Sequence, residues 1–201
     1  MAPTTAERGR EVRQLLVRAA TELIAERGWT AVSTRILAER AGVVPGLVHY
    51  HFASLQALLN EAAVGAMRAA IDGLGSLLDQ ARTPDDALDL LLGSVDQYTG
   101  QDPMSLLFTE TYLAATRDPA LRAEVVAVIT AFLGRFAQWL DGHGVDAPEQ
   151  TAAVLAAAID GVLLHRVLNP AVTAAAVAPV LRRILTPAVT GRSRTRKAGE
   201  D

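Results

Sequence analysis

The sequence predicts an all-α protein, and three of its features support this fold class. Apolar residues recur at spacings of three and four over long stretches, as at Leu121, Val125 and Val128, which is the period of a helix with one buried face. No stretch alternates apolar and polar residues for long enough to indicate a strand. At four places a capping residue stands at or just before a proline, which is typical of a helix start. These starts are Thr83–Pro84, Asp102–Pro103, Asp118–Pro119 and Asp146–Pro148.

Nine helices follow from these starts and from the breaks between the apolar stretches. The first ends at Gly28, and the second and third are only about two turns long, too short to persist in water without support from the first. We therefore expect a three-helix domain over residues 1–53 and a larger helical bundle over residues 54–190. The basic tail, residues 191–201, has no apolar residue able to anchor it and is predicted to be disordered. The expected helices cover about residues 6–27, 34–41, 45–51, 55–81, 84–99, 103–116, 119–141, 147–168 and 173–186.

The two short helices are defined by a cap, a glycine turn and a proline. Ser33 is placed to cap the second helix, which leaves the next two amides free as an anion site. Gly42 can adopt the positive φ that a tight turn requires. Pro45 opens the third helix, on which we expect Val44 and Val48 to face inward.

The composition excludes several classes of protein. Half of the 201 residues are apolar and a fifth are charged, which is typical of a folded chain. Because the chain has no cysteine, it has no disulfide, thiolate metal site or thiol nucleophile. No apolar run approaches the roughly 18 to 20 residues that span a bilayer, and the N-terminus lacks the apolar centre of a signal peptide. We therefore expect a cytoplasmic protein that does not associate with a membrane.

The net charge of −3 hides an asymmetry along the chain. Residues 1–55 carry seven arginines and five glutamates, whereas residues 56–190 carry eight basic and fifteen acidic groups. This distribution indicates that only the front of the chain meets a polyanion. There, a helix, a glycine turn and a short second helix form the pattern of a helix-turn-helix, whose second helix enters the DNA major groove. From spacing alone, a turn between two core helices is an equally good interpretation.

The segment GWTAVSTRILAERAGVVPGLVHYHFASLQALL, residues 28–59, resembles the N-terminal DNA-binding region of the TetR family of bacterial transcriptional regulators. The shared pattern consists of a glycine–aromatic pair, a Thr or Ser cap, an isoleucine–alanine pair, an alanine–glycine–valine turn, a short helix ending in an aromatic/His–Phe run, and a serine that opens the next helix. These features fall on Gly28–Trp29, Ser33, Leu37–Ala38, Ala41–Val43, His49–Phe52 and Ser54–Leu58.

The resemblance implies a homodimer that places one recognition helix in each of two major grooves of a palindromic operator. The residues expected to hold phosphates are Ser33, Arg35, His49, Tyr50 and His51. Those expected to read bases are Thr34, Pro45, Gly46 and Leu47, with Arg35 as a further candidate. The remaining family contact falls on Val44.

Two positions depart from the family pattern. Val44 stands where the family usually has a polar residue, and Leu55 stands where it usually has a lysine that contacts phosphate. The loss of that lysine predicts a lower salt dependence, by roughly one phosphate per subunit. Because valine, proline and leucine cannot form bidentate hydrogen bonds with bases, readout is expected to rely on thymine methyl groups and DNA shape.

In the family the C-terminal body binds a small effector. Its candidate residues here are Tyr98, Phe108, Tyr112, Phe132, Phe136, Trp139, Asp160 and His165. The aromatic residues are open to two interpretations, as ordinary core or as the wall of a cavity for a largely apolar or aromatic effector. Asp160 and His165 are either a polar pair at a subunit seam or ligand contacts. The alanines and Gly161 of the eighth helix allow close approach, so we expect the last two helices to form the dimer seam.

The fourth helix contains Gly73 and Gly75, which either mark a bend or act in a lever that moves the recognition helices when effector binds. The leading hypothesis is a ligand-responsive repressor. The alternative is an all-α sensor or carrier of small molecules with weak or lost DNA binding, which Leu55 and the apolar recognition helix favour. An enzyme is disfavoured, because no Ser–His–acid set, phosphate loop or metal-ligand spacing occurs. We expect no catalytic residue, metal or cofactor.

Overall fold

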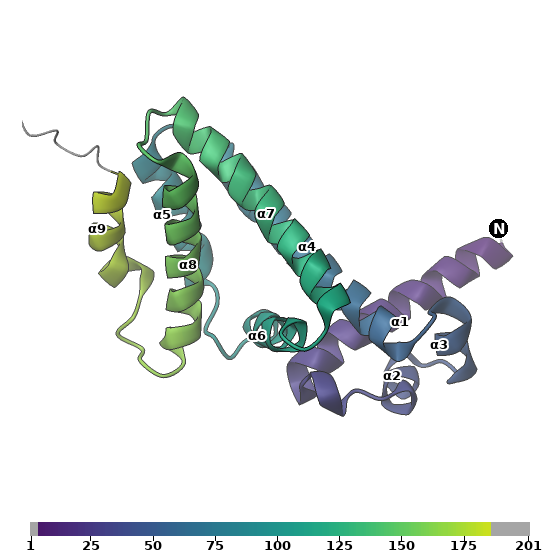
Figure 1. The fold of residues 1–201 in the computed structure, drawn as a ribbon. Coiled ribbons are helices and arrows are strands. Elements are labelled where there is room, and N and C mark those ends of the chain that lie inside the picture. The colour runs from purple at the N-terminus through teal and green to yellow at the C-terminus, as the bar shows by residue number, and fades with distance from the viewer. Residues whose placement is uncertain (1–3, 186–201) are drawn as a thin grey trace, which may run out of the picture.

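The computed structural model describes residues 4–185, and these residues contain helices and no strand (Figure 1). All nine predicted helices are present, although three of the expected ends lie two or three residues too far along the chain. A 3₁₀ turn, η1 (Trp29–Ala31), lies between the first two helices. The helices are α1 (Thr5–Arg27), α2 (Thr34–Ala41), α3 (Gly46–His51), α4 (Leu55–Leu78), α5 (Pro84–Asp96), α6 (Pro103–Ala115), α7 (Pro119–Gly142), α8 (Pro148–Arg166) and α9 (Ala174–Leu185).

Three of the four predicted proline starts have the expected side-chain cap. Thr83 caps α5 by accepting a hydrogen bond from the Asp86 N–H, and Asp102 and Asp118 each accept two backbone N–H groups of the helix that follows. Such caps satisfy donors that the first turn of a helix leaves without partners. The helix starts are therefore local properties of the sequence.

The fourth proline start begins a helix as predicted, but the expected side-chain cap is missing. Asp146 does not cap α8, because the residue at the cap position is Ala147, which has a φ of +47° and makes no side-chain hydrogen bond. Asp146 lies one residue too early for its carboxylate to reach the first turn. Its backbone carbonyl instead accepts the Thr151 hydroxyl at 3.1 Å.

Two apolar cores follow each other along the molecule. The first runs from the N-terminal three-helix unit, which we call the head, through α4 and α6 to the start of α7, and includes Leu16, Leu37, Leu58 and Leu107. The second joins the end of α4 and the end of α7 to α5, α8 and α9. The long helices α4 and α7 thus connect the head with the far end of the molecule (Figure 1). Within residues 4–185 no helix combines the length and the apolar character that crossing a membrane requires.

Val44 does not face inward, contrary to the sequence-based expectation. Its side chain is 66% exposed, whereas Val48 and Phe52 are buried in the head. A helical wheel places Val44 beside Val48 only if the helix already includes residue 44. Because α3 begins at Gly46, Val44 belongs to the preceding turn and points away from the core.

The two glycines late in α4 have different surroundings, and the helix continues unbroken through both. A Cβ on Gly73 would meet nothing within 4 Å, whereas a Cβ on Gly75 would lie 2.5 Å from Nη1 of Arg135 in α7. Arg135 donates hydrogen bonds to the Gly75 carbonyl at 3.2 Å and to Asp79 at 2.6 Å. Gly75 therefore leaves room for a contact between α4 and α7.

We expect Gly73→Ala to raise the free energy of unfolding by about 1 kcal/mol, because alanine is the better helix former at an open, exposed position. Gly75→Ala should gain less, because its methyl group displaces the Arg135 guanidinium. Urea unfolding at fixed protein concentration measures both values. In an Arg135→Ala background the two substitutions should become equivalent. Equal gains with Arg135 present would show that this contact does not constrain residue 75.

Candidate DNA-binding surface and effector-binding body

The cap and the glycine turn that the sequence predicts are both present in the helix-turn-helix. The Ser33 hydroxyl accepts the Ile36 N–H at 3.3 Å at the start of α2. At its end Gly42 has a φ of +68°, and the Val43 N–H donates to the Ala38 carbonyl at 3.0 Å. This left-handed glycine closes α2 and turns the chain sharply into α3.

One side of α3 packs into the head and the other side is open. Val48 is fully buried, whereas Tyr50 is 80% exposed, and a Cβ on Gly46 would meet nothing within 4 Å. The structure places the ten DNA-contact candidates around this open side and at the start of α2. The exposed ones are Ser33, Arg35, Val44, Pro45, Gly46, His49 and Tyr50, and the partly exposed ones are Thr34, Leu47 and His51.

His51 lies against α1 and supports Tyr50. The His51 ring meets the Tyr50 ring edge-on, with centroids 5.0 Å apart, and its Cε1 atom lies 3.9 Å from the position of a Cβ on Gly9. A Cβ at position 9 would therefore meet this ring in ordinary van der Waals contact. The contact helps to orient the exposed Tyr50 side chain.

Two arginines of the basic N-terminal part of the sequence form ion pairs within the protein. Arg40 of α2 forms ion pairs with Glu26 and Glu22 of α1, at 2.6 and 3.2 Å. Arg13 of α1 forms a bidentate ion pair with Glu61 of α4, and its guanidinium lies 4.7 Å from the centroid of the Phe52 ring. Sequence reasoning missed both roles, because no local signal marks partners that are up to 48 residues away.

The body residues proposed to contact effector do not line a common wall. Phe136 is 1% exposed and belongs to the second core. Phe132 and Trp139 are partly buried against that core, and the Trp139 ring stacks on His143 with centroids 3.8 Å apart. Phe108 packs against the first core instead. Tyr98, also partly buried, lies in the connection between α5 and α6.

Within one protomer, Asp160 and His165 do not pair with each other. Five residues apart on a helix, they lie about 140° apart around its axis. Asp160 instead accepts a long hydrogen bond of 3.5 Å from the Tyr112 hydroxyl of α6. Partial burial and the nearby carboxylate raise the pKa of Tyr112 to about 12. Burial also raises the pKa of Asp160, although the hydrogen bond from Tyr112 acts to lower it. His165 is exposed one turn farther along α8.

Two surface grooves border α1. One, between α1 and α2, has a volume of about 360 Å³, and the other, between α1 and α4, has a volume of about 680 Å³. Neither is lined by any of the eight effector candidates. The wider groove is rimmed by Arg10, Arg13 and Arg18 and has Val17 and Ala62 among its lining residues.

Helices α8 and α9 expose large apolar side chains. Leu168, directly after α8, is 83% exposed. An apolar patch of this kind on a folded protein usually marks an interaction surface. The other large apolar residues exposed on these two helices are Val154, Leu164, Val180 and Ile184.

Two parts of the sequence match known protein families. The family of bacterial regulatory proteins called tetR matches residues 16–62, and the tetracyclin repressor-like C-terminal domain matches residues 82–187. A transcriptional regulator from Streptomyces coelicolor A3(2) is 30% identical in sequence, and the alignment covers 88% of this chain and 99% of that one with a TM-score of 0.72. No protein with a curated description matches this sequence.

Two further solved structures share the fold at lower sequence identity. A transcriptional regulator from Saccharomonospora viridis, in complex with choline, is 20% identical, and the match covers 87% of this chain and 95% of that one with a TM-score of 0.70. FadR from Bacillus subtilis, in complex with stearoyl-CoA, is 19% identical, and the match covers 86% of this chain and 97% of that one with a TM-score of 0.68.

Proposed function

Because this chain belongs to the TetR family of bacterial transcriptional regulators, we propose that it is a cytoplasmic repressor. In this proposal a homodimer binds a palindromic operator and leaves it when the body binds a small, largely apolar effector. The family consists of DNA-binding regulators and not of enzymes. The proposal requires no metal and no cofactor.

The observation that best supports operator binding is the open side of α3, held in place by the buried Val48. The polar groups proposed to hold phosphates flank this surface, as recognition by a helix-turn-helix requires. Thr34, Pro45, Gly46 and Leu47 are proposed to face the bases, with Arg35 as a further candidate. The exposed Val44 adds an apolar contact, so thymine methyl groups are the complementary feature of the DNA.

Dimerisation through α8 and α9 is supported by the exposed apolar side chains on both helices. An isologous interface buries the same residues of two protomers about a two-fold axis. Covering Leu164 and Leu168 would remove two large apolar side chains from water. The same arrangement would supply two heads for the two halves of an operator.

We keep all eight candidates as part of the effector site, but propose Phe136 as a support and not as a direct contact. Phe136 is a supporting residue of the core, whereas Tyr112 and Asp160 form the polar pair that an effector between α6 and α8 would meet first. The aromatic candidates elsewhere in the body favour a largely apolar molecule. The two related structures hold chemically different ligands, choline and stearoyl-CoA. Because these ligands do not agree, we infer the effector's chemistry from the residues of this chain's own body.

Mobility shift assays across a range of salt concentrations test the operator proposal, with the DNA upstream of the protein's own gene and a scrambled fragment of equal length. We expect tighter binding to the upstream fragment and a fall in affinity as salt rises. Failure to bind either fragment at low salt would instead favour the alternative, a small-molecule sensor or carrier that has lost DNA binding.

In the same assay, Leu55→Lys should steepen the salt dependence of binding. Each added phosphate contact increases the slope of log K against log salt by about 0.9, so one lysine per protomer adds about two per dimer. Leu55 is partly buried against the first core, and Leu55→Met, which keeps an apolar side chain, is the matched control and should leave the slope unchanged. An unchanged slope for Leu55→Lys would place residue 55 away from the DNA backbone.

A further inference from the structure

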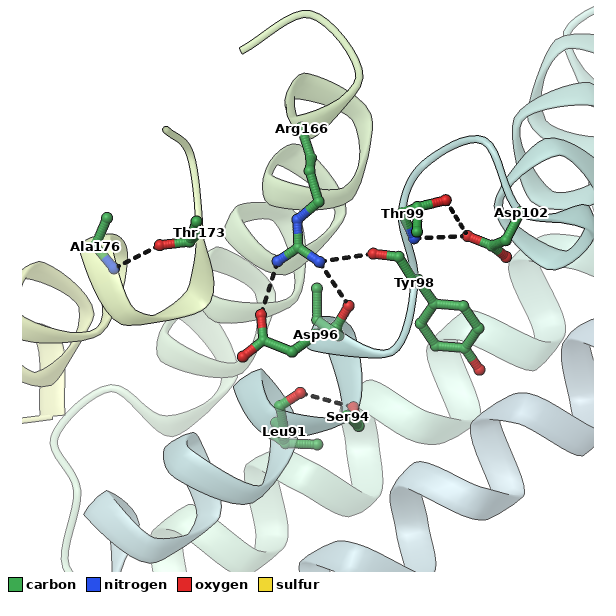
Figure 2. A network of polar contacts seen from close by, with 10 residues as sticks. Leu91, Ser94, Asp96, Tyr98, Thr99, Asp102, Arg166, Thr173 and Ala176 are labelled. Carbon is green, nitrogen blue, oxygen red and sulfur yellow. Dashed lines mark hydrogen bonds and ion pairs between the residues drawn. The ribbon is translucent and has the colours of Figure 1, made fainter. Parts of the chain in front are cut away.

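Helix α6 is linked to α8 by one hydrogen bond and through the chain that precedes α6, and it is linked to the head by a further hydrogen bond. At its start, Arg166 of α8 holds the chain that leads into it (Figure 2). In its last turn, Tyr112 donates to Asp160 of α8. On another side of the same helix, Glu110 accepts a hydrogen bond from the backbone of the head.

Arg166 fixes the end of α5 and the chain beyond it. Its Nη1 donates to the backbone carbonyls of Val95 at 3.0 Å and Tyr98 at 2.6 Å, and its Nη2 donates to the Asp96 carboxylate at 2.9 Å (Figure 2). The Arg166 side chain is only 14% exposed. A guanidinium is well suited to this role, because it is planar, always charged and able to donate several hydrogen bonds in fixed directions.

The connection from α5 to α6 is tightly held on both sides. Gly100 is buried with a φ of +82°, and a Cβ there would collide with the Val167 side chain and lie 3.1 Å from the Leu163 carbonyl of α8. The Thr99 N–H donates to Asp102 at 2.8 Å (Figure 2), and Asp102 caps α6. The last turn of α8 therefore determines where α6 begins.

Glu110 joins α6 to the corner between α1 and α2. Its carboxylate accepts the Trp29 backbone N–H at 2.7 Å, and it lies 3.3 Å from the position of a Cβ on Gly28, which has a φ of +80°. Within residues 4–185 this is the only hydrogen bond that joins α6 to the head. A carboxylate that accepts a backbone N–H forms a charge-assisted hydrogen bond, which is stronger and more directional than a neutral one.

We propose that Glu110 is the positioning residue through which displacements of α6 relative to α8 reach the DNA-binding head. A shift of α6 along its axis either carries the Gly28–Trp29 corner with it or breaks this hydrogen bond. The other polar connection between head and body, Arg13 to Glu61, runs through α4 and does not involve α6. The inference rests on the proposed function for its biological meaning, but the coupling can be measured without DNA or effector.

The test follows the backbone amide signal of Trp29 in nitrogen-15 NMR spectra of the full-length protein. Arg166→Met, which removes the anchor at the start of α6, should shift this signal when Glu110 is present. With Glu110→Ala the shift caused by Arg166→Met should fall to less than a third. Glu110→Gln keeps a carbonyl acceptor and should restore at least half of it.

Glu61→Ala is the matched control, because it breaks the connection through α4 and should leave the Arg166 effect on Trp29 intact. If Arg166→Met does not fold, Tyr112→Phe perturbs the same helix by removing only the hydrogen bond to Asp160. Equal shifts with and without Glu110, or no shift in either background, would overturn the proposal. Because the measurement uses no DNA, failure of the coupling and failure of operator binding are separate results.

Discussion

Leu164→Asp combined with Val180→Asp should convert the protein into a monomer and weaken operator binding by at least about 100-fold. Both side chains are exposed on α8 and α9, and each would bring an unpaired carboxylate into the apolar face of both protomers. A dimer binds two half-sites at once, and losing the second half-site typically costs a factor of about 10²–10⁴ in affinity. This is the largest effect on DNA binding that we expect from substitutions outside the head.

Sedimentation velocity gives the mass of the variant, and the mobility shift assay gives its affinity. Gln80→Asp, an exposed position after the end of α4, is the control for added charge and should remain dimeric. A variant of dimeric mass would move the interface away from α8 and α9. A monomer with unchanged affinity would instead separate dimerisation from operator binding.

Phe136→Ala should lower the free energy of unfolding by about 3–5 kcal/mol, which is typical of a large aromatic residue removed from a packed core. Phe136 is 1% exposed, and its ring lies 6.0 Å from that of Phe132 by centroid distance. If it lined an open cavity, the ring would already have empty space on one side, and its removal would cost much less.

Urea or thermal unfolding measures this loss, at fixed protein concentration because dimerisation contributes to apparent stability. Trp139→Ala is the matched control: this ring is partly buried and stacks on the exposed His143, so a smaller loss is expected. A loss below about 1 kcal/mol for Phe136→Ala would return this residue to the candidates for direct effector contact.

Expectations that depend on neighbouring residues agree best with the structure. Ser33, Thr83, Asp102 and Asp118 cap the helices they were expected to cap, because a cap needs only a side-chain oxygen within three residues of free N–H groups. Gly42 adopts the left-handed conformation of the predicted turn. The errors at Val44 and Asp146 are also local, and each arises from a helix boundary placed one or two residues away from its true position.

Contacts between distant residues could not be predicted in the same way. Glu110 meets Trp29 across 81 positions of sequence, and Arg166 meets Asp96 across 70. Asp160 was expected to belong to a polar pair with His165 at a subunit seam or to contact ligand, and the structure adds a hydrogen bond from Tyr112 of α6. An arginine or an amide can reach several carboxylates, and the packing of the helices decides which one it reaches. The apolar periodicity of the sequence does not encode this packing.

The sequence alone therefore determined the all-α class, the order of nine helices and the helix-turn-helix with its resemblance to a family, because caps, glycine turns and apolar periodicity act over a few residues. Tertiary structure decided that Phe136 is core, that Arg40 pairs within the head whereas Arg13 pairs with Glu61 of α4, and that α6 connects α8 with the head. These features depend on which surfaces meet when helices far apart in the chain exclude water between them.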